Sequence, residues 1–264
     1  MLASLSRPRR RLAIAVAALA LGAAAGLLSF ALLNRAPAVP PVAQGTLGPV
    51  LLVPGYGGST EALDVLARAL ITQGRDAIVV QSAGDGTGDL AQQAEVLDRE
   101  VTAALARTGA PTVDLVGYSA GGVIVRLWIE EFEAGASVRR VLTLGSPHHG
   151  TTLAAFAGDL TPNACPLACV QLAGDSDLLR SLNADDETPG GPLWVSLWTE
   201  NDRTVIPPDS ASLEGALNFS VQSRCPSLVI EHADLPRTPT VMAMTIGLLG
   251  TNLPRLPGPE VCTP

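Results

Sequence analysis

The sequence contains no lysine; its seventeen basic residues are all arginine. Five of these arginines, at positions 7, 9, 10, 11 and 35, lie in an amino-terminal segment without acidic residues. The rest of the chain therefore has 12 basic and 25 acidic residues, a net charge of −13. An acidic body without a basic stripe argues against binding to nucleic acid and against electrostatic attachment to anionic membranes.

Nucleotide and metal motifs are also missing. The glycine-rich turn at residues 55–58 lacks the Gly-Lys-Ser/Thr ending of a phosphate loop and the G-x-G-x-x-G spacing of a dinucleotide site. One C-x₃-C pair exists, Cys165 with Cys169, but Cys225 and Cys262 lie far apart without a neighbouring histidine. These patterns argue against a bound nucleotide and against a zinc site.

A basic cluster and a long apolar segment begin the chain. Residues 7–11 hold four arginines and precede residues 12–33, which are twenty-two residues without a charge. This order is typical of an export signal, and small residues at 36–38 and 42–43 are candidate cleavage positions. The apolar segment is also long enough to span a bilayer, so an uncleaved membrane anchor is the alternative.

We therefore expect residues 1–35 to form a signal peptide or a membrane anchor. Residues 36–47, which contain three prolines, would form a linker. The protein would be secreted or, in the alternative, anchored to the cell membrane by residues 12–33, and only this uncleaved segment would contact the membrane.

The four cysteines are an even number and all lie in the part of the chain that we expect to be exported, which favours disulfides. Three pairings are possible. We favour Cys165 with Cys169, which closes a local loop, and Cys225 with Cys262, which ties the tail to the domain.

Residues 48–264 form one expected domain, in which short apolar runs alternate with longer segments of helical periodicity. The strands that we expect lie at residues 49–54, 77–80, 112–116, 138–144, 193–198, 218–221 and 228–230. The helices that we expect lie at about 61–71, 90–107, 123–132 and 240–249. This alternation predicts an α/β domain, a mainly parallel sheet with helices on both faces and a site at the carboxyl ends of its strands. It breaks over residues 152–192, an insert that we expect to cover part of the site.

Residues 114–122, Asp-Leu-Val-Gly-Tyr-Ser-Ala-Gly-Gly, join an expected strand to an expected helix. They contain the G-x-S-x-G pattern of a nucleophile elbow, in which a serine occupies a sharp, strained turn and glycines leave room for the adjacent strand and helix. Ser119 would then project over the edge of the sheet, close to the free N–H groups and the positive dipole end of the helix. The sequence therefore predicts a serine nucleophile beside a place where an oxyanion can form.

A serine nucleophile needs an imidazole to accept its proton and a carboxylate to orient that imidazole. Of the three histidines, only His232 follows the candidate acids, as the chain order of serine, acid and histidine in this architecture requires. We expect a structural role for His148 and His149. Asp202 follows a predicted strand and is the predicted acid, with Glu200 as the nearest alternative.

The oxyanion needs two N–H donors that are held in place before the reaction. The amide of Ala120, next to the nucleophile, would supply one donor. The amide of Tyr56, in the glycine turn after the first strand, has the position of the other.

Five stretches in this order resemble the small secreted bacterial lipases of the α/β-hydrolase superfamily, the actinobacterial and Bacillus-type triacylglycerol lipases. The stretches are residues 53–58, 117–122 and 145–151, the Asp202 loop and His232. The resemblance covers about residues 48–250, and Ser146 stands where threonine is frequent in these lipases.

This resemblance implies an α/β-hydrolase fold and a serine ester hydrolase that acts on acylglycerols or other carboxylic esters without a metal or cofactor. It implies Ser119, Asp202 and His232 as the catalytic triad, and the amides of Tyr56 and Ala120 as the oxyanion hole. We expect the enzyme to be a monomer.

The natural substrate is open, because lipases, short-chain esterases, thioesterases and polyester hydrolases share this machinery. The apolar insert at residues 153–182 would shape an acyl groove, which favours lipid esters and a lipase. A hypothesis of another class is an exported binding domain on a hydrolase fold. It would require a missing triad position, and each position is filled.

Overall fold

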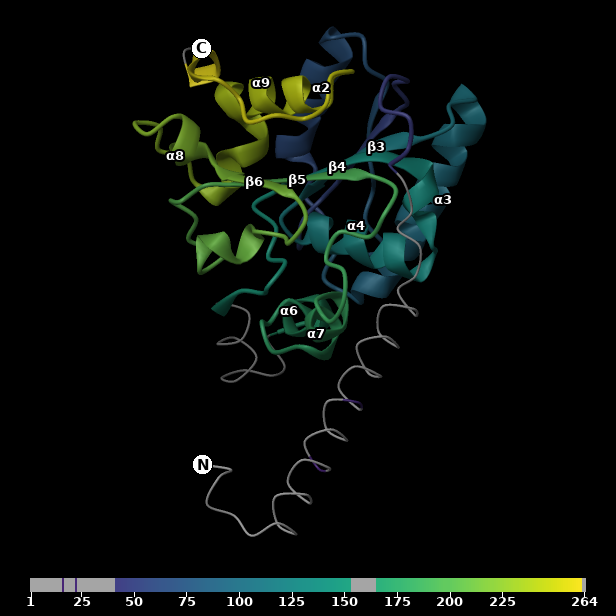
Figure 1. The fold of residues 1–264 in the computed structure, drawn as a ribbon, viewed down its shortest axis with the longest axis vertical. Helices are drawn as coiled ribbons and strands as arrows, with labels where there is room; N and C mark the ends of the chain where they lie inside the picture. The colour runs from purple at the N-terminus through teal and green to yellow at the C-terminus, as the bar shows by residue number, and fades with distance from the viewer. Residues whose placement is uncertain (1–15, 17–21, 23–40, 153–164, 263–264) are drawn as a thin grey trace. The chain divides into compact units, whose positions relative to one another are not determined.

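The computed structural model describes residues 41–152 and 165–262, and residues 16 and 22 singly (Figure 1). Contacts divide the chain after residue 38, and the following description concerns residues from 41 onward. The expected signal peptide or anchor, and residues 153–164 of the expected insert, lie outside the described residues. Within the part that is described, no helix has both the length and the apolar character that crossing a membrane requires.

A sheet of six parallel strands forms the centre of the domain, in the order β2-β1-β3-β4-β5-β6. The strands are β1 (Val50–Val53), β2 (Ala77–Val79), β3 (Val113–Tyr118), β4 (Val138–Leu144), β5 (Leu193–Trp198) and β6 (Leu217–Ser220). Gly117, near the end of β3, aligns with Val53 on one side and with Thr143 on the other. The carboxyl ends of the central strands therefore meet at one edge, where the sequence predicts the site.

Helices cover both faces of this sheet (Figure 1). They are α2 (Glu61–Thr72), α3 (Leu90–Thr108), α4 (Ala120–Glu131), α6 (Leu167–Gln171), α7 (Asp177–Leu182), α8 (Val221–Arg224) and α9 (Pro239–Leu248). Alternate residues of β1 point to opposite faces: Leu51 and Val53 pack with α3 and α4, whereas Val50 and Leu52 pack with α2 and α9. The predicted α/β architecture with helices on both faces is confirmed.

Short 3₁₀ turns complete the described domain, at Ala134–Ser137, Pro208–Ala211, His232–Arg237 and Pro259–Cys262. Helix α3 is capped at both ends. The Asp89 carboxylate accepts a hydrogen bond from the Ala91 amide at the first turn, and Gly109, at a φ of 68°, ends the helix in the left-handed conformation.

The expected strand at residues 228–230 was wrong. These residues form no strand and lead directly into the 3₁₀ turn at His232–Arg237. The carbonyl oxygens of Leu228 and Ile230 accept hydrogen bonds from the side chains of Gln222 and Thr199 instead of from the backbone of a neighbouring strand. The segment is therefore held beside the sheet without becoming part of it.

Two disulfides join the four cysteines, Cys165 with Cys169 and Cys225 with Cys262, and these are the two pairs that the spacing favours. The first lies in the described part of the insert. Arg126 of α4, which is 1% exposed, also holds this part of the chain. Its guanidinium donates to side-chain and backbone oxygens of the insert, at Asn183, Leu182 and Glu187.

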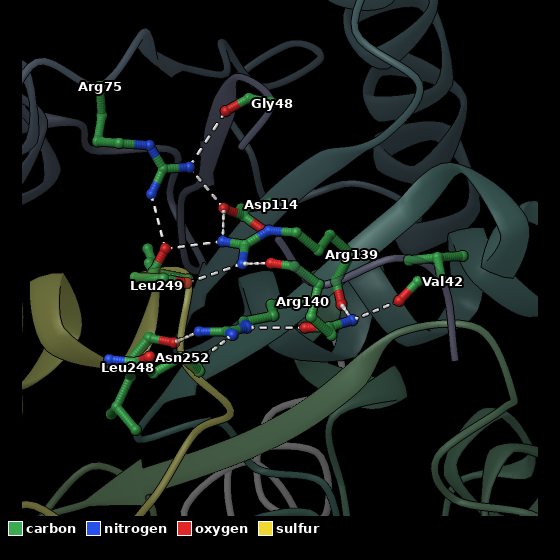
Figure 2. Close-up of polar contacts among 11 residues, drawn as sticks. Val42, Gly48, Arg75, Asp114, Arg139, Arg140, Leu248, Leu249 and Asn252 are labelled. Atoms are coloured by element: carbon green, nitrogen blue, oxygen red, sulfur yellow. Dashed lines mark hydrogen bonds and ion pairs between the residues drawn. The ribbon is translucent and has the colours of Figure 1, made fainter. Parts of the chain in front are cut away.

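A buried ionic cluster lies at the amino ends of β3 and β4 (Figure 2). Arg139 donates from Nε to Oδ1 of Asp114 over 2.8 Å and from Nη2 to Oδ2 over 2.5 Å. Arg75 donates from Nη2 to the same Oδ2 over 2.5 Å. Both Asp114 and Arg139 have no exposed side-chain surface, so this carboxylate is compensated by two guanidinium groups instead of water.

The guanidinium groups of this cluster also close the end of helix α9. Arg75 and Arg139 donate to the carbonyl of Leu249, and Arg140 donates to the carbonyl of Leu248 (Figure 2). These carbonyls have no partner within the helix, and they lie at its negative dipole end, where cations are favourable. Burial lowers the pKa of Arg140 to about 10.

The cluster also binds the segment before β1. The carbonyl of Gln44 accepts a hydrogen bond from Arg139 Nη1 over 3.0 Å, and its side-chain oxygen accepts from Arg140 Nε over 3.0 Å. Gly48 accepts from Arg75 through its carbonyl over 3.1 Å. The cluster therefore ties together the start of the domain, two central strands and the last helix.

Candidate active site

Ser119 lies in the turn between β3 and α4, at φ 53° and ψ −127°. A positive φ is uncommon for a residue other than glycine and marks a strained turn. The turn is possible because its neighbours lack side chains. A Cβ on Gly121 would lie 2.2 Å from the carbonyl oxygen of Val53, and a Cβ on Gly117 would lie 2.5 Å from the Cα of Gly122. The serine can therefore adopt this conformation because glycines stand where any side chain would clash.

His232 lies between Ser119 and Asp202. Its Nε2 is 3.0 Å from Ser119 Oγ, and its Nδ1 is 2.6 Å from Asp202 Oδ2. The other oxygen of Asp202 accepts hydrogen bonds of 2.8 Å from the amides of Thr204 and Val205. A carboxylate only accepts hydrogen bonds, so these partners assign the imidazole proton to Nδ1 and leave Nε2 to accept from the serine hydroxyl. The three predicted residues thus form one hydrogen-bonded chain.

The alternative candidates lie in other environments. Glu200 accepts a hydrogen bond from Ser220 Oγ over 2.6 Å, whereas the hydrogen-bond partners of the imidazole are Asp202 and Ser119. His148 is fully buried, which holds its pKa well below the usual range, and its Nε2 contacts Thr143 Oγ1. His149 pairs with Glu187 over 2.7 Å. The structure therefore brings neither histidine into the Ser119 cluster, in agreement with the expected structural role.

The two predicted oxyanion donors flank Ser119. Ala120 is the first residue of α4, and Tyr56 follows Gly55 in the loop after β1. A Cβ built on Gly55 would lie 2.8 Å from the Cβ of Ser119, so this loop passes directly beside the nucleophile. Among the described residues, neither the Tyr56 nor the Ala120 amide has a hydrogen-bond acceptor. Both N–H groups are therefore available to a bound oxygen.

A cavity of about 330 Å³ opens beside Ser119 and His232. Tyr118 forms part of its wall, 5.2 Å from the His232 ring between centroids. Burial, reinforced by the charge of Asp202, raises the pKa of Tyr118 to about 12, so its hydroxyl stays protonated and donates to the His232 carbonyl over 3.3 Å. A larger hollow of about 750 Å³ between α9 and residues 251–261 contains none of these groups.

Several side chains around this cluster are not predicted from the sequence. Thr199 and Gln222 hold the segment before His232, and Tyr118 contacts His232 itself. Tyr118 lies inside the elbow motif and could have been found there. Gln222 has no sequence signal, because a single glutamine in a short helix has no pattern.

Comparisons with known proteins identify a family and one related lipase. The family model described as palmitoyl protein thioesterase matches residues 49–182. A triacylglycerol lipase of Burkholderia plantarii is 32% identical over 161 residues, which cover 57% of this chain and 43% of the lipase. The chain thus spans less than half the length of that relative.

Solved structures share the fold at lower identity. A lipase from Bacillus licheniformis in its mature form matches with a TM-score of 0.64 at 19% identity, over 81% of this chain and 96% of its own. Lipase B of Aspergillus fumigatus matches with a TM-score of 0.65 at 16% identity, over 80% of this chain and 55% of its own. The parallel sheet with its two helix layers is the α/β-hydrolase fold, as the resemblance implies.

Proposed function

The chain belongs to the palmitoyl protein thioesterase family, and from this premise we propose that it is a serine hydrolase of carboxylic esters, a lipase that cleaves acylglycerols. One observation carries the proposal. Ser119 Oγ lies 3.0 Å from His232 Nε2, while His232 Nδ1 lies 2.6 Å from Asp202, at the wall of a cavity. The similarity to a triacylglycerol lipase supports the choice of acylglycerols.

The first half of the reaction acylates the serine. Ser119 Oγ attacks the carbonyl carbon of the ester while His232 Nε2 accepts the hydroxyl proton. The oxyanion that forms accepts hydrogen bonds from the amides of Tyr56 and Ala120, and each such donor is worth about 10²–10³ in rate. The carbon–oxygen bond then breaks, and the leaving alcohol takes the proton from His232.

The second half releases the acid. A water molecule gives a proton to His232 Nε2 and attacks the acyl carbon, and Ser119 then leaves with that proton. Asp202 accepts the Nδ1 proton of His232 in a hydrogen bond throughout, which keeps the imidazole in the required tautomer and stabilises its charged form. Water is the one co-reactant that this chemistry needs.

A thioesterase is the second candidate, because the matched family model bears that name. A thioester has the same attacked carbonyl carbon and differs in its leaving group, a thiol instead of an alcohol. The serine, the base and the oxyanion donors would therefore act in the same way on both substrates. The choice between them depends on the groove and not on the triad.

The test is hydrolysis of a graded series by the purified chain and by its Ser119→Ala variant. The series contains oxygen esters from acetyl to long-chain acyl groups, emulsified triacylglycerol, and thioesters of the same acyl groups. We expect serine-dependent activity that persists to long chains. Activity on short chains alone would identify an esterase, and a preference for thioesters at equal acyl length would identify a thioesterase. No serine-dependent hydrolysis of any of them would refute the proposal.

We propose that residues 1–35 direct the export of the protein and that it acts as a secreted monomer. The two disulfides support an oxidising compartment. Amino-terminal sequencing of the chain from culture medium and from membranes tests this proposal. A cleaved chain in the medium is expected, whereas an uncleaved chain in the membrane fraction would support anchoring by residues 12–33.

A further inference from the structure

The base of the proposed triad does not follow a strand. β6, the last strand of the sheet, ends at Ser220, and residues 228–231 have no regular secondary structure before His232 begins a 3₁₀ turn. Ile230 in this segment is nevertheless 3% exposed. Other groups must therefore hold the segment that carries the imidazole.

Side chains hold it in place of a strand. The carbonyl of Leu228 accepts from Gln222 Nε2 over 2.9 Å, and the carbonyl of Ile230 accepts from Thr199 Oγ1 over 2.8 Å. The carbonyl of His232 accepts from the Tyr118 hydroxyl over 3.3 Å. Every second carbonyl is bonded, which is the pattern of one edge of an extended chain. The donors come from side chains where a sheet would use backbone amides.

Thr199 connects this segment to the acid. Its hydroxyl donates to Ile230 and accepts from the amide of Asn201 over 3.2 Å and from Gln222 Nε2 over 3.0 Å. Its own carbonyl accepts from the amide of Asp202 over 3.2 Å. The side chain is fully buried, and a hydroxyl has one donor and two acceptor positions. Every hydrogen-bonding position of the hydroxyl is therefore in use.

Gln222 supports the same connection from helix α8. Its Nε2, whose two protons are shared among three acceptors, also lies 3.0 Å from Asn201 Oδ1, and its Oε1 accepts from the amide of Glu200 over 2.9 Å. Gln222 thus contacts the turn that leads to Asp202 and the segment that leads to His232. The backbone of Glu200, the alternative acid, is thus part of this support, while its side chain accepts from Ser220.

We propose that Thr199 is the residue that sets the position of His232 relative to Asp202, with Gln222 as its support. The inference rests on the proposed function, because the pair to be positioned is the proposed acid and base. Thr199 is not among the residues that line the cavity, and its hydroxyl is bonded to the segment before His232, so it is a positioning residue. Tyr118 is a weaker support, because 3.3 Å is long for a hydroxyl donor.

The test compares Thr199→Val with Thr199→Ser. Valine keeps the branched shape but removes the hydroxyl, whereas serine keeps the hydroxyl. We expect Thr199→Val to lower kcat by about 10- to 100-fold, because a misplacement of about 1 Å costs roughly this much. KM for a p-nitrophenyl ester should change by less than about twofold, since the ester does not touch Thr199, and Thr199→Ser should recover kcat to within about threefold of the wild type.

Thermal unfolding curves for the three proteins show whether each is folded at the assay temperature. A folded Thr199→Val protein with wild-type kcat would overturn the proposal. A Thr199→Ser protein that is as impaired as Thr199→Val would also overturn it, because the hydroxyl would then not be the active feature.

A second measurement separates this proposal from the proposed function. Proton NMR of protein with ¹⁵N-labelled histidine detects the His232 Nδ1 proton that is hydrogen-bonded to Asp202, whether or not any ester is hydrolysed. We expect this signal in the wild type and in Thr199→Ser, and its loss or broadening in Thr199→Val. An unchanged signal in folded Thr199→Val would refute the positioning role even if the enzyme proved inactive on every ester.

Discussion

Two buried carboxylates lie at opposite ends of the same sheet, and their partners differ. Asp114, at the amino end, has a side chain without exposed surface and is bonded to Arg139 and Arg75. Asp202, after the carboxyl end of β5, has a side chain that is 1% exposed and is bonded to His232. Both anions have replaced water by hydrogen-bond donors, as burial of a charge requires.

The partner decides what each pair can do. Arginine stays charged in proteins, and the guanidinium groups around Asp114 also donate to backbone carbonyls at the end of α9. Histidine can take up and release a proton, and the second nitrogen of His232 faces Ser119. The Asp114 cluster therefore holds chain segments together, whereas the Asp202–His232 pair orients the imidazole that accepts the proton of Ser119. The comparison predicts that changes at one end affect stability and changes at the other affect catalysis.

The largest effect should come from Ser119→Ala. Removal of the attacking oxygen should lower kcat by at least about 10⁴-fold, because the remaining groups cannot form an acyl-enzyme. The unfolding free energy should change by less than about 1 kcal/mol, since no core contact is lost. Ester hydrolysis and urea unfolding measure the two quantities. A large loss of stability together with activity would erase the contrast between the two ends of the sheet.

Asp202→Asn should rank second, with a loss of about 10⁴-fold in kcat, because the amide no longer holds the Nδ1 proton of His232. Glu200→Gln is the matched control, since Glu200 contacts Ser220 and not the imidazole. It should retain kcat within about twofold. If Asp202→Asn were active and Glu200→Gln inactive, the acid would have to be reassigned.

These two ends also differ in how far the sequence predicts them. The Ser119 turn is predictable because it needs residues without side chains at Gly117 and Gly121, where a Cβ would clash. Chain order selects His232, and the place of Asp202 after a predicted strand selects the acid. The partners of Asp114 are not predictable in this way. A carboxylate inside an apolar strand indicates that a cation is near, but Arg75 and Arg139 reach it only through the folded arrangement.

The wrong prediction of a strand at residues 228–230 has a similar cause, because its contacts also depend on the folded arrangement. Leu228, Val229 and Ile230 have the apolar, branched character of a strand, yet a strand needs a neighbouring edge with free backbone groups. Here the side chains of Gln222 and Thr199 donate hydrogen bonds to the carbonyls of Leu228 and Ile230 instead. Which donor reaches a carbonyl depends on residues far away in the chain, so local propensity cannot decide it.

Asp114→Asn should have the largest effect on stability. The change removes the negative charge that compensates buried Arg139, and loss of one partner of a buried pair costs about 3–5 kcal/mol. Urea unfolding measures this difference, and kcat of the folded protein should stay within about twofold of the wild type. A strong drop in kcat without a change in stability would show that the two ends are coupled, contrary to the comparison.

Gln44→Ala should have the smallest effect. It removes a hydrogen bond of 3.0 Å to Arg140 and one of 3.1 Å to the Arg139 carbonyl from a partly exposed position. We expect a loss of about 1 kcal/mol in unfolding free energy and an unchanged kcat. A loss as large as that of Asp114→Asn would mean that the segment before β1, and not the carboxylate, holds the cluster together.

The most direct test of the central claim is mass spectrometry of the protein quenched in acid during turnover of a p-nitrophenyl ester. We predict a transient increase equal to the acyl group, mapped by peptide analysis to Ser119 and absent from Ser119→Ala. Turnover with the acyl group on another residue, or with no adduct under conditions that trap acyl-enzymes, would contradict the assignment of Ser119 as the nucleophile.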